Sequence, residues 1–349
     1  MRSLSITAVM LSLLVLCTLG VGQQAPVPAV APATARLDQT LGGLDGPGFV
    51  LAHREDSDSL FAACERGTIR YWSKDVWAGV RTGTNTPHLL KGHEGPVIAL
   101  ARGSGAALAS AGADGKVLLW NLDEGKVLQS ITPEAIVRTL AFSPDGATLV
   151  GGGDAAVVYV WETATAKLKT KLEGHTDWVW SIAFSPDGKQ LVSGSSDGSV
   201  ILWDFANLKK QLSFSSSPPP PANTPPSKTG NTALGLTFSP DGKLIALGGS
   251  DMQIHIVNPA DGKFVRSMPG HTSSVTGLSF NPDGKLLVSG SKDRTVRLWD
   301  ATNGQALKIL DGHTAWVQGV TFLAKGTRVA SVSADQTVRV WDLTPPPAK

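Results

Sequence analysis

The sequence has 349 residues, of which 42% are hydrophobic and 17% charged, with 38 Gly and 22 Pro, a composition typical of a globular protein rich in turns. The formal net charge is +2 and no basic run is longer than the pair Lys209-Lys210, so the electrostatic signature of a nucleic-acid-binding protein is missing. We therefore expect no nucleic-acid partner.

The first 22 residues have the pattern of a secretory signal peptide. Arg2 is followed by an uncharged apolar stretch from Ile6 to Leu19 and by small residues before Gln23. We expect residues 1–22 to be removed, which makes the mature protein secreted or periplasmic and leaves it without a membrane span. The alternative is an uncleaved anchor, for which the apolar run is short.

The next segment, residues 23–34, is rich in Ala, Pro and Val and carries no charge, a composition typical of an extended tether. Once the signal is removed, Cys64 is the only cysteine, so the mature protein cannot form an internal disulfide. Its stability must come from packing.

The rest of the chain repeats one residue constellation in a fixed register. In three copies a Gly-His pair is followed by Ser 18, Asp 22 and Trp 28 residues after the His, and a fourth copy is one residue shorter between His and Ser. The four sets are His93, Ser110, Asp114, Trp120; His175, Ser193, Asp197, Trp203; His271, Ser289, Asp293, Trp299; and His313, Ser331, Asp335, Trp341. A period of about 42 from Gly-His to Trp-Asp indicates propeller blades of four strands.

These motifs resemble those of the WD-repeat family over nearly everything after about Ala35, and the leader suggests a secreted, bacterial-type member. Counting the repeat length from the recurring position of the Trp adds three degenerate repeats, with Trp72, Trp161 and, in place of a Trp, Val257 at that position. The resemblance implies an all-β, seven-bladed propeller of four-stranded antiparallel blades over residues 35–344, followed by a tail at 345–349.

Repeat four illustrates one expected blade. Apolar patterning predicts strands at residues 179–184, 191–195 and 200–203 and an outer strand near 209–214. The sequence Ser-Pro-Asp-Gly at 185–188 predicts the tight turn after the first strand. A single blade cannot bury both faces, so the blades must stack around a central axis.

Ring closure needs a strand from the other end of the chain. Repeat seven ends soon after Trp341 and has no residues left for an outer strand, whereas residues 35–41 match outer strands such as 305–310. We predict that this N-terminal strand pairs into the last blade, which removes open sheet edges.

Recurring His, Ser and Asp invite a hydrolase interpretation, because a nucleophilic Ser needs a base and the base needs an orienting carboxylate. Four equivalent copies argue against it. In the resembled family the four side chains form a buried hydrogen-bond chain, so we predict structural tetrads, no enzyme activity, no cofactor and no metal site. The single histidines His53, His88 and His255 are interpreted as packing or surface residues.

Repeats one, three and five lack complete sets, and we expect their blades to rely on apolar packing and on neighbouring blades. The substituted or displaced positions are Leu44, Ala62 and Arg66 in repeat one, Gly151 and Ala155 with Asp154 one place early in repeat three, and Leu247 and Val257 around Asp251 in repeat five.

In the resembled family, partners usually dock on the face that carries the outer-to-inner strand loops and the turns between second and third strands. The positions that point there supply the predicted partner-binding residues Trp178, Trp180, Trp316, Lys292, Arg138 and Gln318. The alternative is that these Trp residues pack between loops.

Two insertions interrupt the repeats. Residues 215–229 contain Pro218–Pro221 and Pro225-Pro226 and reach the predicted docking face, as a stiff spacer, a ligand for aromatic grooves or a tolerated loop. Residues 73–84, with Trp77, are expected on the opposite face.

The sequence therefore predicts a monomeric, non-catalytic scaffold for a protein or peptide partner. Two alternatives remain open. One is an enzyme or small-molecule receptor that uses the central channel, and the other is a membrane-anchored recognition module that keeps residues 1–22.

Overall fold

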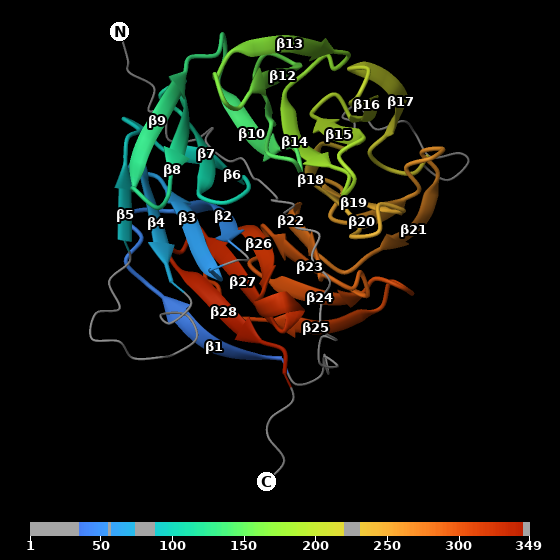
Figure 1. Cartoon of the computed structure of the whole chain (residues 1–349). Coiled ribbons are helices and arrows are strands. Elements are labelled where there is room, and N and C mark those ends of the chain that lie inside the picture. Colours follow the sequence, from blue (N-terminus) through green and yellow to red (C-terminus); the bar gives the residue numbers. More distant parts are fainter. Residues whose placement is uncertain (1–34, 55–56, 74–87, 220–230, 345–349) are drawn as a thin grey trace, which may run out of the picture.

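A computed structural model describes residues 35–54, 57–73, 88–219 and 231–344. These residues form seven four-stranded antiparallel sheets, arranged as blades around a central axis (Figure 1). Within the described ranges the only helical element is a short 3-10 turn, η3 (Ala324–Gly326). The predicted all-β, seven-bladed propeller is confirmed.

Each blade has an inner strand nearest the axis, then a second, a third and an outer strand (Figure 1). The inner strands of blades 1 to 7 are β2 (Gly48–Arg54), β6 (Val97–Arg102), β10 (Val137–Phe142), β14 (Val179–Phe184), β18 (Ala233–Phe238), β22 (Val275–Phe280) and β26 (Val317–Leu323). The second strands are β3 (Ser59–Cys64), β7 (Ala107–Gly112), β11 (Thr148–Gly153), β15 (Gln190–Ser195), β19 (Ile245–Gly249), β23 (Leu286–Ser291) and β27 (Arg328–Ser333). The third strands are β4 (Thr68–Trp72), β8 (Val117–Asn121), β12 (Val157–Glu162), β16 (Ser199–Asp204), β20 (Ile254–Val257), β24 (Val296–Asp300) and β28 (Val338–Asp342). The outer strands are β5 (His88–Lys91), β9 (Lys126–Ile131), β13 (Leu168–Glu173), β17 (Lys209–Ser215), β21 (Phe264–Met268), β25 (Ala306–Leu310) and β1 (Arg36–Leu41).

The N-terminal strand closes the ring. β1 pairs antiparallel with β28, so the outer strand of blade 7 comes from the opposite end of the chain (Figure 1). Arg36 and Asp342 form an ion pair at 3.0 Å across this junction, and Arg328 lies 3.4 Å from Asp38. The predicted closure is confirmed, and it pairs a strand edge that would otherwise be open.

The hairpin between the first two strands follows its turn chemistry. In blade 4, the Ser185 hydroxyl donates to Asp187 at 2.7 Å and accepts the amide of Gln190 at 2.9 Å. Gly188 has a φ of +70°, which a residue with a side chain adopts only with strain. A Cβ there would lie 3.3 Å from Pro144 Cδ in the preceding blade, so the turn also packs against its neighbour.

Small residues let neighbouring blades approach. A Cβ added to Gly194 on β15 would lie 2.6 Å from the Cβ of Ala233 on β18, and one added to Gly248 on β19 would lie 2.7 Å from Val275 on β22. Such distances are far below van der Waals contact, so glycine is required where the blades pack together. The core therefore lies between blades, as layers of buried Val, Leu, Ile and Trp side chains.

Alternating strand direction assigns every turn to one of two faces. The connections from an outer strand to the next inner strand and the turns between second and third strands share one face, which we call the tryptophan face because Trp178, Trp180 and Trp316 lie on it. The Ser-Pro-Asp-Gly turns and the turns before the outer strands lie on the opposite face.

Several expectations fall outside the described residues. They concern the signal at 1–22, the tether at 23–34, most of the Pro-rich insertion, the loop with Trp77 and the tail at 345–349. In the parts of the chain that the structure describes, no helix has the length and apolar character needed to cross a membrane.

Candidate functional site

The four complete sets each form one continuous chain of hydrogen bonds. In blade 6, the Trp299 indole N–H donates to the Ser289 hydroxyl at 2.8 Å, and that oxygen lies 2.7 Å from His271 Nε2. His271 Nδ1 lies 2.7 Å from Asp293, which also accepts the backbone amide of Thr272 at 3.0 Å. The chain links the third strand, the second strand, the loop before the inner strand and the turn after the second strand.

The other three sets repeat this geometry. The His Nε2 to Ser Oγ distance is 2.8 Å for His93 with Ser110, His175 with Ser193 and His313 with Ser331. The indole to Ser Oγ distances are 2.8 Å for Trp120, 2.9 Å for Trp203 and 3.1 Å for Trp341. The His Nδ1 to carboxylate distances are 3.0 Å for Asp114, 3.1 Å for Asp197 and 2.7 Å for Asp335.

The protonation states of each set follow from its burial and its partners. Burial lowers the pKa of His93, His175, His271 and His313, although the neighbouring carboxylates oppose this shift. Burial opposes ionisation of Asp293, but hydrogen bonds from His271 and Thr295 outweigh it and hold the pKa of this carboxyl well below its usual range. A neutral His then donates a hydrogen bond from Nδ1 to a carboxylate and accepts one from the Ser hydroxyl at Nε2.

The burial of the four serines decides what these sets can do. Ser110, Ser193, Ser289 and Ser331 are each 0% exposed, and each hydroxyl oxygen also accepts a Trp N–H. An electrophile in solvent has no access to such an oxygen. The arrangement is suited to holding strands and turns together, because every buried polar group in it has a partner.

Blade 5 contains a polar network in addition to the apolar packing and the neighbouring blades on which we expect the degenerate blades to rely. There Asn231 occupies the loop before the inner strand, and its side-chain oxygen accepts the amide of Asp251 at 2.9 Å. Asp251 lies 2.7 Å from His255 on the third strand, and His255 lies 2.7 Å from Ser267 on the outer strand. The sequence reading missed this network because His255 comes from a strand position that is apolar in repeat four.

Blades 1 and 3 also contain polar contacts that the register does not predict. In blade 1, the Thr68 hydroxyl donates to Asp45 at 2.8 Å. In blade 3, Tyr159 stacks on Trp161 with ring centroids 5.2 Å apart, and Lys171 lies over the Tyr159 ring at 5.7 Å. Side chains outside the repeat register thus make the contacts in these two blades.

The tryptophan face carries a cluster at the junction of blades 3 and 4. Arg138 on β10 lies 4.4 Å from the centroid of the Trp178 ring and 5.1 Å from that of Trp180, and it forms a bidentate pair with Asp154. The two indoles are tilted by 58° with centroids 5.6 Å apart, and the Trp180 N–H donates to Ser196. The Arg138 charge is therefore already neutralised within the protein.

A second cluster lies at the junction of blades 6 and 7. Lys292, in the turn after β23, places its ammonium 5.4 Å from the ring centroid of Trp316, which is 40% exposed. Burial lowers the pKa of Lys292. Among the ion pairs of the described residues, none involves Lys292. This cluster combines an exposed indole with a cation that has no carboxylate partner there.

Three of the six predicted docking residues are not displayed. Trp180 is 7% exposed, Arg138 6% and Gln318 1%, so the expectation that they face a partner is wrong. Each is the extra residue of a β-bulge at the start of an inner strand, and a bulge aims its side chain differently from the regular strand. Trp178 is half-buried, Lys292 is half-buried and Trp316 is exposed.

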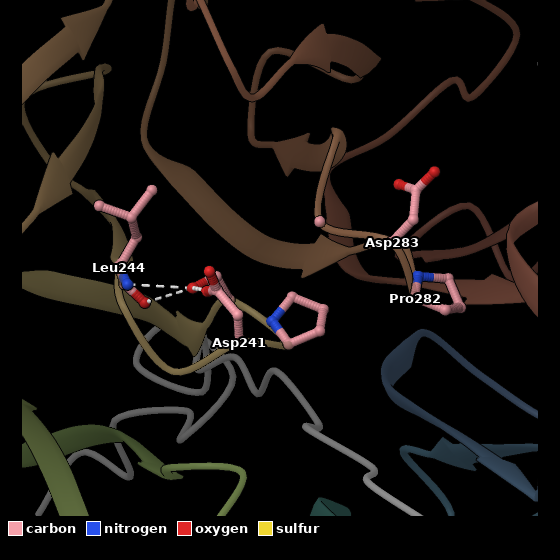
Figure 2. A pocket seen from close by; sticks show the side chains of 7 residues that line it. Asp241, Leu244, Pro282 and Asp283 are labelled. Atoms are coloured by element: carbon pink, nitrogen blue, oxygen red, sulfur yellow. Dashed lines mark hydrogen bonds between the residues drawn. The ribbon is translucent and has the colours of Figure 1, made fainter. Parts of the chain in front are cut away.

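The opposite face has a shallow hollow between blades 5 and 6. Figure 2 shows that Asp241 and Leu244 line one side and Pro282 and Asp283 the other, from two consecutive Pro-Asp-Gly turns. Its volume is about 290 Å³, at the lower limit of small-molecule sites, which have roughly 300–1,000 Å³. Within the described residues no group of three or more His, Cys, Asp or Glu side chains is placed to hold a metal ion.

Comparison with protein families identifies the repeat. Six segments match the model described as WD domain, G-beta repeat, at residues 84–121, 125–162, 166–204, 226–258, 262–300 and 304–342, more than half of the chain. The chain belongs to the WD-repeat family. Five of the matched segments join an outer strand to the next three strands, as in 125–162, which contains β9 to β12, whereas 226–258 contains only β18 to β20. The first three strands of blade 1, β2 to β4, lie outside the matches, and the structure confirms the seventh repeat that the sequence predicts.

Relatives of this WD-repeat protein match over parts of their length. Autophagy-related protein 16 of Arabidopsis thaliana is 25% identical over 256 residues, which cover 73% of this chain and 47% of the relative. WD repeat-containing protein VIP3 of the same plant is 35% identical over 213 residues, 60% of this chain and 51% of the relative. Small ribosomal subunit protein RACK1y of Oryza sativa subsp. japonica is 40% identical over 75 residues, 21% of this chain and 22% of the relative. The chain thus spans about half or less of these relatives.

Proposed function

We propose that this protein is a non-catalytic scaffold that works outside the cytoplasm and binds a protein or peptide partner on the tryptophan face, at Trp178 and Trp316. The observation that carries the proposal is the exposed Trp316 indole beside the half-buried Lys292 ammonium. Tryptophan is one of the residue types that supply a large share of the binding energy at protein interfaces.

The two clusters are held in place before any partner arrives. Trp178 contacts both the Arg138 guanidinium and the Trp180 ring, and Trp316 lies beside the Lys292 ammonium. A side chain that is already ordered loses little rotamer entropy on binding, so more of its contact energy contributes to affinity. The buried Trp180 and Arg138 therefore hold Trp178 in place and are not contact residues themselves.

The family relation also supports a binding role. Small ribosomal subunit protein RACK1y is, by its name, a component of a larger assembly, and nuclear distribution protein nudF of Emericella nidulans is 34% identical over 112 residues. A seven-bladed ring presents a wide rigid face, which suits the binding of proteins or peptides. The partner of this chain would be recognised by residues other than those of these relatives, since the residue types at the docking positions vary from repeat to repeat.

The extracytoplasmic setting is part of the proposal and depends on residues 1–22. Their basic start, apolar stretch and small residues are typical of a secretory signal. N-terminal sequencing of the protein purified from its native source tests this. A mature chain that starts near Gln23 supports secretion, whereas an intact Met1 would favour the anchored module.

The docking face is tested by affinity capture from the native envelope or secreted fraction. We expect the double variant Trp178→Ala with Trp316→Ala to lose partners that the wild type retains, by at least about 2 kcal/mol or roughly 30-fold in Kd if either is a hot spot. The matched control is Leu128→Ala with Leu168→Ala, two exposed apolar residues on outer strands away from this face. Identical partner sets for the wild type and the Trp variant would refute the proposed face.

A further inference from the structure

Three outer strands carry a serine in the same register. Ser130 on β9 pairs with Leu118, Ser213 on β17 pairs with Ile201, and Ser267 on β21 pairs with His255. All three serines are exposed. Directly opposed residues in antiparallel strands project to the same face of the sheet, so each serine side chain lies beside that of its partner. In blade 5 alone the partner of such a serine is a histidine.

The contact in blade 5 has the geometry of an activated serine. Ser267 Oγ lies 2.7 Å from His255 Nδ1, and His255 Nε2 lies 2.7 Å from Asp251 Oδ2. A carboxylate only accepts hydrogen bonds, so in the neutral imidazole the proton is on Nε2 and Nδ1 is free to accept the Ser267 hydroxyl proton. Nucleophile, base and orienting carboxylate are thus in contact in the order that hydroxyl activation requires.

The base is held rigidly and shielded from solvent. His255 is 1% exposed and meets the Phe264 ring edge to face, with centroids 5.5 Å apart and an angle of 84°. Asp251 is fixed in turn, because its backbone amide donates to Asn231. A base with one orientation and one tautomer is prepared for proton transfer without rearrangement.

The contrast with the four tetrads is decisive. The tetrad serines are 0% exposed, and a Trp N–H occupies each hydroxyl oxygen. Ser267 is exposed, and the position of the tetrad Trp in this repeat is taken by Val257, which has no such donor. Ser, His and Asp therefore form a fully buried structural network in four blades. In blade 5 the same three residue types form a network whose serine is exposed to solvent.

We propose that Ser267 is a reactive serine that accepts an acyl or phosphonyl group from an activated donor, with His255 as general base and Asp251 as its orienting carboxylate. The Ser267 oxygen forms a bond to the electrophilic carbon or phosphorus while the bond from that atom to the leaving group breaks. The hydroxyl proton passes to His255 Nδ1 and from there to the leaving group. The transfer modifies the protein once, and it is independent of partner binding on the tryptophan face.

The test uses the purified full chain and an alkyl fluorophosphonate. In this reaction the Ser oxygen displaces fluoride from phosphorus, and peptide mass spectrometry locates the label. We expect labelling at Ser267 and none at Ser130 or Ser213, the exposed serines in the same register. Ser267→Ala should abolish the label, and Ser130→Ala should leave it unchanged.

The role of the histidine is tested separately. His255→Leu gives blade 5 the residue that blade 2 has at this position, and we expect at least about 100-fold slower labelling, the usual contribution of a general base. Asp251→Asn, which keeps the shape of the carboxylate, should also slow the reaction, and circular dichroism confirms that each variant is folded. Absence of label on Ser267, equal labelling of Ser130 and Ser213, or an unchanged rate in folded His255→Leu would overturn the proposal.

Discussion

Replacement of Ser289 by alanine removes the hydroxyl at the centre of the blade 6 tetrad. The hydroxyl oxygen accepts the Trp299 N–H at 2.8 Å and lies 2.7 Å from His271 Nε2. Ser289 itself is 0% exposed. The Trp299 N–H and the Nε2 atom of His271 would stay buried without a hydrogen bond, since the cavity left by one oxygen is too small for water. Each unpaired buried group costs about 1–3 kcal/mol, so we expect the free energy of unfolding to fall by roughly 2–6 kcal/mol.

Urea unfolding followed by far-UV circular dichroism measures this change. Ser130→Ala is the matched control, because Ser130 is exposed on an outer strand and its loss should alter the free energy of unfolding by less than about 0.5 kcal/mol. Trp299→Phe removes the indole donor, and in the double variant with Ser289→Ala the two losses should not add, since they share one hydrogen bond. Equal effects of Ser289→Ala and Ser130→Ala would refute the structural role of the tetrad.

Three further perturbations test the fold and its faces. Deletion of residues 35–44 removes β1 from its pairing with β28, so the whole ring should melt at a lower temperature, and calorimetry matching the intact protein would refute the closure. Stability should fall as pH decreases below about 6.5, because burial lowers the pKa of His93, His175, His271 and His313 and the unfolded chain therefore binds more protons. Stability should fall again below about pH 4, because tetrad carboxylates such as Asp293 have a lowered pKa in the folded state and become protonated on unfolding. A urea midpoint that stays constant from about pH 7 to about pH 5 would contradict the histidine contribution. Arg138→Met should release Trp178 and shift its fluorescence, because the guanidinium no longer lies over the ring. The control Lys308→Met, on an outer strand, should leave the tryptophan fluorescence unchanged. Identical spectra for Arg138→Met and the wild type would contradict the stacking.

Much of the fold could be predicted because the repeat is a local pattern. His175, Ser193, Asp197 and Trp203 belong to one blade and one stretch of chain, so their spacing predicts their hydrogen bonds. Closure by residues 35–41 was also predictable, because their pattern matches that of other outer strands such as 305–310. The spacing could not predict His255 with Ser267, since that contact arises from substitutions specific to blade 5.

The sequence by itself determined the number of blades, the order of strands and the positions of the turns, because each depends on residue types at fixed spacing along the chain. Only the tertiary structure decided which side chains are displayed. Trp180, Arg138 and Gln318 share the register of a docking face, yet bulges turn them inward at the blade junctions, whereas Trp316 stays exposed beside Lys292. The physical reason is that exposure depends on the neighbouring blade, about forty residues away, and a local pattern carries no information about how two blades pack.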